Sequence, residues 1–153
     1  MNQQTNQFKT IQVIGIGLLS GIAFFLVISL WLQDTVSMDY DAEDFMLPIA
    51  FMLFFSGAIA AFYLVNRFLV PPTSYNLSAK ISNYQTKIII KMALLEGPSF
   101  FAIFQFLNSG SLLYLLIPLF AVILMVYLFP SKHKFISEYQ LSMQDKIIID
   151  KMN

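Results

Sequence analysis

The chemistry that this sequence could perform centres on a single acidic residue, Glu96, inside a long apolar segment. Glu96 lies nine positions after Lys87, which is about 13.5 Å along a helix that rises 1.5 Å per residue. That depth is close to the middle of a hydrocarbon layer about 30 Å thick. A charge there costs about 2.5–3.5 kcal/mol on insertion scales, and burial favours the neutral carboxyl. We therefore expect Glu96 to face the interior of a helical bundle, as a candidate site for a proton or a cation.

Glu96 is followed by Gly97 and Pro98, which predict a break in its helix. A proline has no N–H group, so one main-chain carbonyl loses its usual donor, and the glycine lowers the cost of bending. Two interpretations remain open. In the first, the carboxyl exchanges protons or cations, as intramembrane acids commonly do. In the second, a protonated carboxyl is hydrogen-bonded to Ser20, Ser56 or a freed carbonyl and fixes the packing of the helices.

Four apolar segments are long enough to position that carboxyl in a membrane. Of the 153 residues, 58% are hydrophobic and 12% are charged, which is about half the charge of a typical soluble domain. A spanning helix needs about 20 apolar residues and satisfies its own backbone hydrogen bonds in lipid. The sequence therefore predicts an all-α membrane protein, a single domain over 1–153, whose transmembrane helices cover 11–32, 45–66, 88–108 and 112–129.

The distribution of charge predicts the orientation of these helices. If successive helices alternate in direction, all nine basic residues fall on one side of the membrane. The opposite side carries an acidic loop, 33–44, with five acidic residues and no basic residue. Basic residues are enriched in cytoplasmic loops. We therefore expect a multi-pass protein of the cell inner (cytoplasmic) membrane with both termini in the cytoplasm.

The first and third predicted helices share a pattern that indicates an internal duplication. Residues 17–25 read GLLSGIAFF and residues 93–101 read ALLEGPSFF, with both Leu, one Gly and both Phe identical at an offset of 76. Further along, residues 81–85 (ISNYQ) resemble residues 136–140 (ISEYQ). Both copies start on the same side, so we expect two duplicated hairpins in a parallel repeat, packed as a four-helix bundle. Chance similarity between helices rich in Phe and Leu is the alternative.

Small residues on the first two helices predict where these helices pack. Helices in lipid approach one another closely through small side chains. Gly17 and Gly21 form a GxxxG step on the first helix, and Gly57 and Ala61 belong to a small face on the second. We expect these two faces to meet.

Residues 93–101 (ALLEGPSFF) resemble the carboxyl-bearing helix of rotary ATPase proteolipid (c-type) subunits. Those helices carry a similar Ala-Leu-x-Glu run, followed by a small or proline position and an aromatic residue. The family also includes four-helix members that arose by duplication of a hairpin and lost the acid from one copy. The resemblance implies that Glu96 is an ion-binding carboxylate. In the duplication proposed above, Ser20 occupies the position that matches Glu96.

The segment after the last span, 131–153, predicts short amphipathic cytoplasmic helices. Phe135, Tyr139, Met143 and Ile147 recur at steps of four, which places them on one helical face. We expect these helices to lie on the inner leaflet, where basic side chains bind anionic lipid head groups. The candidate lipid-binding residues are Lys132, Lys134, Lys146 and Lys151.

The composition argues against most other chemistry. The chain has no cysteine and one histidine, His133, so thiolate sites and histidine-rich metal sites are excluded. The acidic run 39–44 lacks the Gly and Glu of a calcium loop at its sixth and twelfth positions, and we interpret it as a solvated loop. A net charge of zero argues against a nucleic-acid partner. We therefore predict no cofactor, no metal and no enzymatic activity.

Two functions remain after these exclusions. The first is a structural or accessory subunit of a membrane assembly, whose partner is a second copy of the chain or another membrane protein. The second is a proton- or cation-translocating channel, carrier or proteolipid-like subunit that uses Glu96 as its intramembrane carboxylate.

Overall fold

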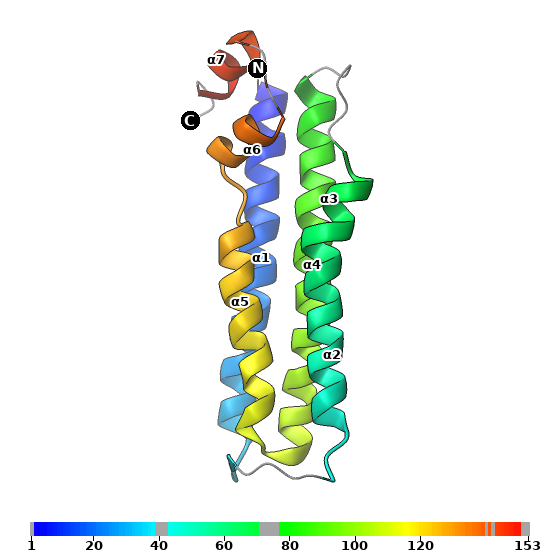
Figure 1. Cartoon of the computed structure of the whole chain (residues 1–153). Coiled ribbons are helices and arrows are strands. Elements are labelled where there is room, and N and C mark those ends of the chain that lie inside the picture. Colours follow the sequence, from blue (N-terminus) through cyan, green and yellow to red (C-terminus); the bar gives the residue numbers. More distant parts are fainter. Residues whose placement is uncertain (1, 39–42, 71–76, 140, 142, 151–153) are drawn as a thin grey trace.

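The computed structural model is a bundle of long helices, and it describes residues 2–38, 43–70, 77–139, 141 and 143–150 (Figure 1). Over these residues it contains no strand, and its one β-bridge joins Ser37 to Ser111. The predicted all-α class is therefore confirmed. In chain order the elements are α1 (Asn2–Leu32), α2 (Met46–Ile59), the π-helical turn η1 (Ala60–Leu64), α3 (Val65–Phe68), α4 (Leu77–Ser109), the 3-10 turn η2 (Leu112–Leu115), α5 (Leu116–Leu128), α6 (Lys132–Glu138) and α7 (Met143–Asp150).

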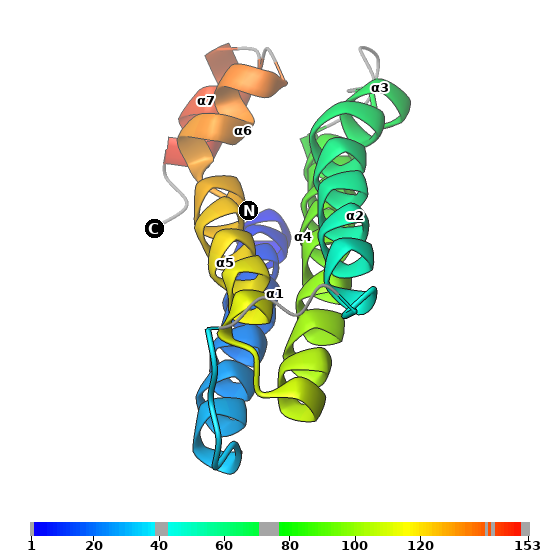
Figure 2. The same ribbon diagram turned by 60° about the horizontal axis from the view of Figure 1, so that its bottom comes forward.

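Helix α4 is the central element of the bundle. It runs parallel to α1 and antiparallel to α2 and α5, and it packs against all three (Figure 1). Figure 2 shows α1 and α5 on one side of the bundle and α2 and α4 on the other. The start of α1 and the helices α6 and α7 lie at one end, which we call the tail end. The opposite end, where 33–45 and 110–111 connect the helices, is the loop end.

The long contact between α1 and α4 follows from the spacing of their buried residues. On α1 the buried positions Phe8, Gly15, Ile22 and Ser29 recur at steps of seven. On α4 the buried side chains alternate at steps of three and four, a spacing that keeps one seam of each helix facing its neighbour. The members of this series are Leu77, Ile81, Tyr84, Ile88, Lys91 and Leu95.

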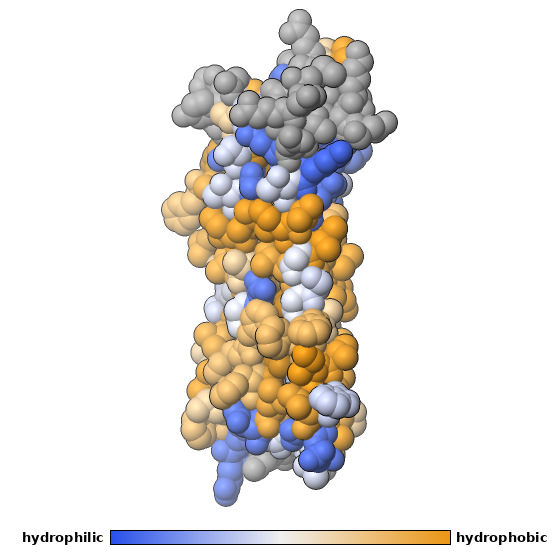
Figure 3. Space-filling view, turned by 180° about the vertical axis from the view of Figure 1, so that it is seen from behind, coloured by the Kyte–Doolittle hydropathy of each residue, from blue (hydrophilic) through white to orange (hydrophobic). Residues whose placement is uncertain are grey.

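Three helical segments are long and apolar enough to cross a membrane, namely Gln7–Leu32, Met46–Phe68 and Leu77–Ser109. The count rises to four if Leu112–Leu128 and Lys132–Glu138 form one span that is bent by 70°. Figure 3 shows apolar surface over most of the length of the bundle. An outer surface this apolar is compatible with lipid as the surrounding solvent.

Two helices begin well before the predicted spans. α1 begins at Asn2 rather than at residue 11, and α4 begins at Leu77 rather than at residue 88. The added turns bury Phe8 and Tyr84 at the tail end, where both rings contact Phe135 of α6 at centroid distances of 6.2 and 5.1 Å. Hydropathy missed these turns because single buried faces among polar residues do not make an apolar run.

The segment 131–153 contains the short helices that were predicted, but they do not share one apolar stripe. Phe135 and Tyr139 are buried against the bundle, whereas Met143 and Ile147 are exposed. The side chain of Ser131 caps α6 by accepting a hydrogen bond of 3.3 Å from the backbone N–H of Lys134. The tail is therefore in part a component of the bundle core.

Candidate functional site

Glu96 lies on the side of α4 that faces α1, next to a residue without a side chain. A Cβ atom on Gly21 would lie 3.8 Å from Oε1 of Glu96, so the glycine gives the carboxyl room to lie against α1. One turn further along both helices, the rings of Phe25 and Phe100 meet edge to face at a centroid distance of 5.2 Å. The parallel α1 and α4 therefore hold the carboxyl at their contact line, halfway along the bundle.

The carboxyl is only partly covered, which differs from the expected position inside the bundle. Glu96 has intermediate exposure, while Ser20 and Ala93 beside it are exposed. A Cβ atom on Gly17 or Gly97 would meet nothing within 4 Å. Figure 3 shows a hydrophilic and weakly polar area midway along the otherwise apolar rear surface. We call this surface of α1 and α4, formed by Gly17, Ser20, Gly21, Ala93, Glu96 and Gly97, the Glu96 face.

The two serines expected to bond the carboxyl have other partners. The hydroxyl of Ser20 donates to the carbonyl of Gly17 at 2.9 Å, and the hydroxyl of Ser56 donates to that of Leu53 at 2.9 Å. Within the described part of the chain, Glu96 forms no hydrogen bond and no ion pair. Its carboxyl is thus held by packing alone.

The helix is not interrupted at Gly97 and Pro98, because α4 continues from Leu77 to Ser109 with Pro98 inside it; a bend at this point stays a prediction. The carbonyl of Leu94, which loses its helical donor at Pro98, lies against α2. Gly57 lies so close to the freed carbonyl of Leu94 that a Cβ atom would be 2.4 Å from its oxygen. This contact was not predicted, although a glycine and a helical proline were its two visible signals in the sequence.

The small residues therefore pack differently from the prediction. Gly57 of α2 packs on α4 rather than on α1, and Ala61 is fully buried. On α1, Gly21 faces Glu96 of α4, and Gly17 borders open space. The expected contact between the glycines of α1 and the small face of α2 is not the one observed, because α4 packs against both helices.

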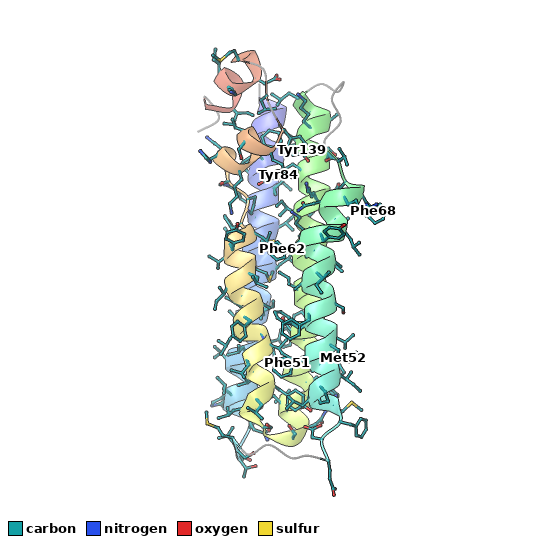
Figure 4. The ribbon with its side chains drawn as sticks, viewed as in Figure 1. Phe51, Met52, Phe62, Phe68, Tyr84 and Tyr139 are labelled. Carbon is teal, nitrogen blue, oxygen red and sulfur yellow. The ribbon has the colours of Figure 1, made fainter. Side chains whose placement is uncertain are left out.

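At the tail end, two segments with similar sequences lie in contact with each other. Residues of 81–85 contact residues of 136–140 directly: the hydroxyl of Tyr139 donates to Oδ1 of Asn83 at 2.6 Å, and the rings of Tyr84 and Tyr139 meet at 5.9 Å (Figure 4). Burial, together with the charge of Glu138, raises the pKa of Tyr139, which keeps this hydroxyl a donor. The duplication itself stays a prediction.

An ion pair fixes α6 to α4 at the same end. Lys87, which is 3% exposed, binds the carboxylate of Glu138 through its Nζ. Removing one partner from a buried ion pair is strongly destabilising, so the two residues depend on each other. This pair was not predicted, since nothing in the sequence relates a lysine just before the third predicted span to an acid in the tail.

The loop end is held by Asp44, the last residue of the acidic loop 33–44. Its Oδ1 accepts the backbone N–H of Met46 at 3.0 Å, and its Oδ2 accepts the hydroxyl of Tyr114 at 2.6 Å. These bonds lie beside a cavity of about 280 Å³. The described residues contain no group of three His, Cys, Asp or Glu side chains that could hold a metal ion. Residues 39–42 and Lys151, which the sequence analysis singled out, lie outside the described residues.

Comparison of the chain with protein-family models, with curated proteins and with solved structures finds no match.

Proposed function

We propose that the protein is a non-enzymatic subunit of a membrane assembly, and that the Glu96 face is the surface on which a partner helix packs. The chain would lie in the inner membrane with its tail end in the cytoplasm. Exposed aromatic residues near both ends, Trp31 toward the loop end and Tyr63 and Tyr127 toward the tail end, suit the two interfaces of a bilayer.

One observation carries this proposal: a partly exposed carboxyl lies in the middle of an apolar surface and is surrounded by small residues. Lipid cannot solvate a carboxyl at that depth, and small residues allow a second helix to come close. A partner helix that covers Glu96 would satisfy the carboxyl and fill the open space beside Gly17 and Gly97. The partner is a second copy of this chain or another membrane protein.

The same observation also favours a second function, translocation of a proton or a cation by Glu96. A carboxyl without a hydrogen-bond partner in the described chain is free to exchange a proton. Its position at the surface would let it meet a path in a partner subunit. This is the role that the resemblance to proteolipid subunits implies.

Single-cysteine crosslinking in native membranes tests the partner surface. The chain has no cysteine, so Gly97→Cys introduces the only thiol on the Glu96 face. Ile59→Cys is the matched control, since Ile59 is 63% exposed on α2. We expect a disulfide dimer or a single crosslinked partner with Gly97→Cys and none with Ile59→Cys. Equal yields from both variants, or a monomer by native mass spectrometry without crosslinks, would contradict the proposal.

Ion flux into vesicles separates the two functions. If Glu96 translocates protons or cations, the protein purified together with its partner conducts them in vesicles, a lipophilic carbodiimide labels Glu96, and Glu96→Gln abolishes both effects. If the protein is an accessory subunit, neither the natural chain nor Glu96→Gln conducts, while crosslinking through Gly97→Cys persists.

A further inference from the structure

The tail end contains a pocket of about 220 Å³ between α4, α5 and α6. At about 30 Å³ for each water, it has room for roughly seven water molecules or for a small polyatomic ion. Lys91 and Tyr84 reach it from α4, Tyr127 from the end of α5, and Lys134 and Glu138 from α6. Most of its polar groups are therefore cations and hydroxyls.

Lys91 is the strongest sign that the pocket is built for a ligand. It is 7% exposed and, among the residues that the structure describes, has no carboxylate within 4.0 Å and no hydrogen-bond partner. Side chains on a helix tilt toward its N-terminus, so the ammonium of Lys91 is directed toward the tail end and the pocket. The Nζ atom itself is not fully buried, so it opens into the pocket, where an anion would supply the missing counter-charge.

Tyr84 supplies a second, independent sign. Its hydroxyl is fully buried and is the one buried side-chain polar atom without a partner among the described residues. The backbone of Ser131 lies near this hydroxyl without completing a hydrogen bond. Unpaired buried donors are rare in native proteins, and each calls for a bound group to complete it.

The remaining charges around the pocket are arranged so that an anion is favoured. Glu138, the one acid that lines the pocket, is already bound by Lys87. Lys134 donates to the carbonyls of Tyr127 and Phe129 and lies 5.1 Å from the centre of the Tyr127 ring. These contacts hold the ammonium of Lys134 in place and occupy two carbonyls that would repel an anion. They include no negatively charged group, so the charge of Lys134 stays uncompensated. The lining carries two lysines against one glutamate, and the charge of that glutamate is already balanced by Lys87, so the positive charges of Lys91 and Lys134 predominate.

We propose that this pocket binds an oxyanion of the phosphate type, with Lys91 and Lys134 as its counter-charges and the Tyr84 hydroxyl as a further donor. Lysine ammoniums bind phosphate as point charges, and a hydroxyl donor directs one of its oxygens. Free phosphate and the head group of an anionic phospholipid offer the same chemistry. Either can reach an opening at the end of the bundle where the basic residues gather.

The test uses the full-length protein in nanodiscs of phosphatidylcholine alone, and measures binding by the shift in thermal unfolding. Inorganic phosphate is added in one arm, and phosphatidylglycerol is included in the disc in the other. We expect one or both to raise the unfolding temperature of the natural chain. Stabilisation by phosphate identifies a soluble anion, and stabilisation by phosphatidylglycerol alone identifies a lipid head group.

Two pocket variants and one control decide whether the pocket is the site. Lys91→Met keeps the volume of the side chain and removes its charge, and we expect the affinity for the stabilising probe to fall at least tenfold. Tyr84→Phe removes only the hydroxyl, and a fall of about threefold to tenfold is expected. Lys9→Gln, at an exposed lysine of the same end, controls for the general loss of one charge. The inference is overturned if neither probe stabilises the natural chain, or if the pocket variants bind as tightly as Lys9→Gln.

Discussion

Gly57 of α2 lies directly on the main-chain carbonyl of Leu94 in α4, at a distance that leaves no room for a side chain. That carbonyl is the one that Pro98, four residues further on, cannot engage, because proline has no N–H. Pro98 thus leaves the carbonyl of Leu94 without a helical donor, and Gly57 provides the space in which α2 approaches that carbonyl. This contact brings the backbones of α2 and α4 together two residues before Glu96.

The first prediction follows from this contact. In Gly57→Ala the new methyl group would lie 2.4 Å from the carbonyl oxygen of Leu94, so α2 must move away from α4. Displacing a packed helix costs about 1–3 kcal/mol, which exceeds the gain of up to about 1 kcal/mol from alanine in a helix. We expect a lower unfolding temperature in detergent, measured by circular dichroism.

Gly97→Ala is the matched control for Gly57→Ala. Gly97 also lies in a helix, but a Cβ atom there meets nothing within 4 Å. The same substitution should therefore leave the isolated chain unchanged or stabilise it by about 0.5–1 kcal/mol. Equal destabilisation by both variants would contradict the close approach of α2 to α4.

The second prediction concerns the ion pair between Lys87 and Glu138. In Glu138→Gln the ammonium of Lys87, which is 3% exposed, loses its partner. Breaking a fully buried pair costs about 3–5 kcal/mol, and partial exposure of Glu138 reduces this to about 1–3 kcal/mol. We expect destabilisation of that size by thermal unfolding.

The double variant Lys87→Met/Glu138→Gln distinguishes the lost pair from a general effect of the substitutions. It removes the buried charge together with its partner, so it should recover most of the stability. If the losses of stability in the single variants Lys87→Met and Glu138→Gln simply add in the double variant, the two residues do not interact.

The parts of the fold that the sequence predicts well are those encoded in continuous segments. The apolar stretches around Ile22, Phe54 and Leu95 predict helices, because in lipid a helix alone satisfies the backbone within an open segment. The spacing of buried residues on α1 and α4 was also present in the sequence. The sequence does not contain the register between the two helices. The close approach of Gly21 to Glu96 defines that register.

The parts that the sequence could not supply are contacts between distant segments. The small residues of α1 and α2 predict a contact between these two helices, whereas α4 packs against both. The partial exposure of Glu96 depends on that arrangement and not on its depth. Lys91 lies inside the predicted span 88–108 and Tyr84 lies just before it, and the pocket that they line exists only because α6 folds back over α4.

The third prediction tests the anchor at the loop end. Tyr114→Phe removes the hydroxyl that donates to Asp44 at 2.6 Å, and with it the bond between η2 and the start of α2. A hydrogen bond to a charged acceptor contributes about 1.5–3 kcal/mol, so a loss of that order is expected in unfolding experiments. Tyr127→Phe is the control, since Tyr127 is 67% exposed. An equal effect of both substitutions would refute the anchor.

The fourth prediction concerns Phe135, through which α6 is attached to the bundle. Its side chain is 0% exposed and contacts the rings of Phe8, Tyr84 and Tyr139, so Phe135→Ala leaves a cavity among three aromatic residues. Truncation of a buried Phe costs about 3–5 kcal/mol. Because Phe135 joins α6 to the rings of Phe8 and Tyr84, we expect part of this loss to appear as local detachment of residues 131–150. Limited proteolysis should cut this segment in Phe135→Ala at protease concentrations that leave the natural chain intact. Phe68→Ala, at a side chain that is 77% exposed, should behave as the natural chain does, and cleavage of both variants alike would show that α6 is not held by Phe135.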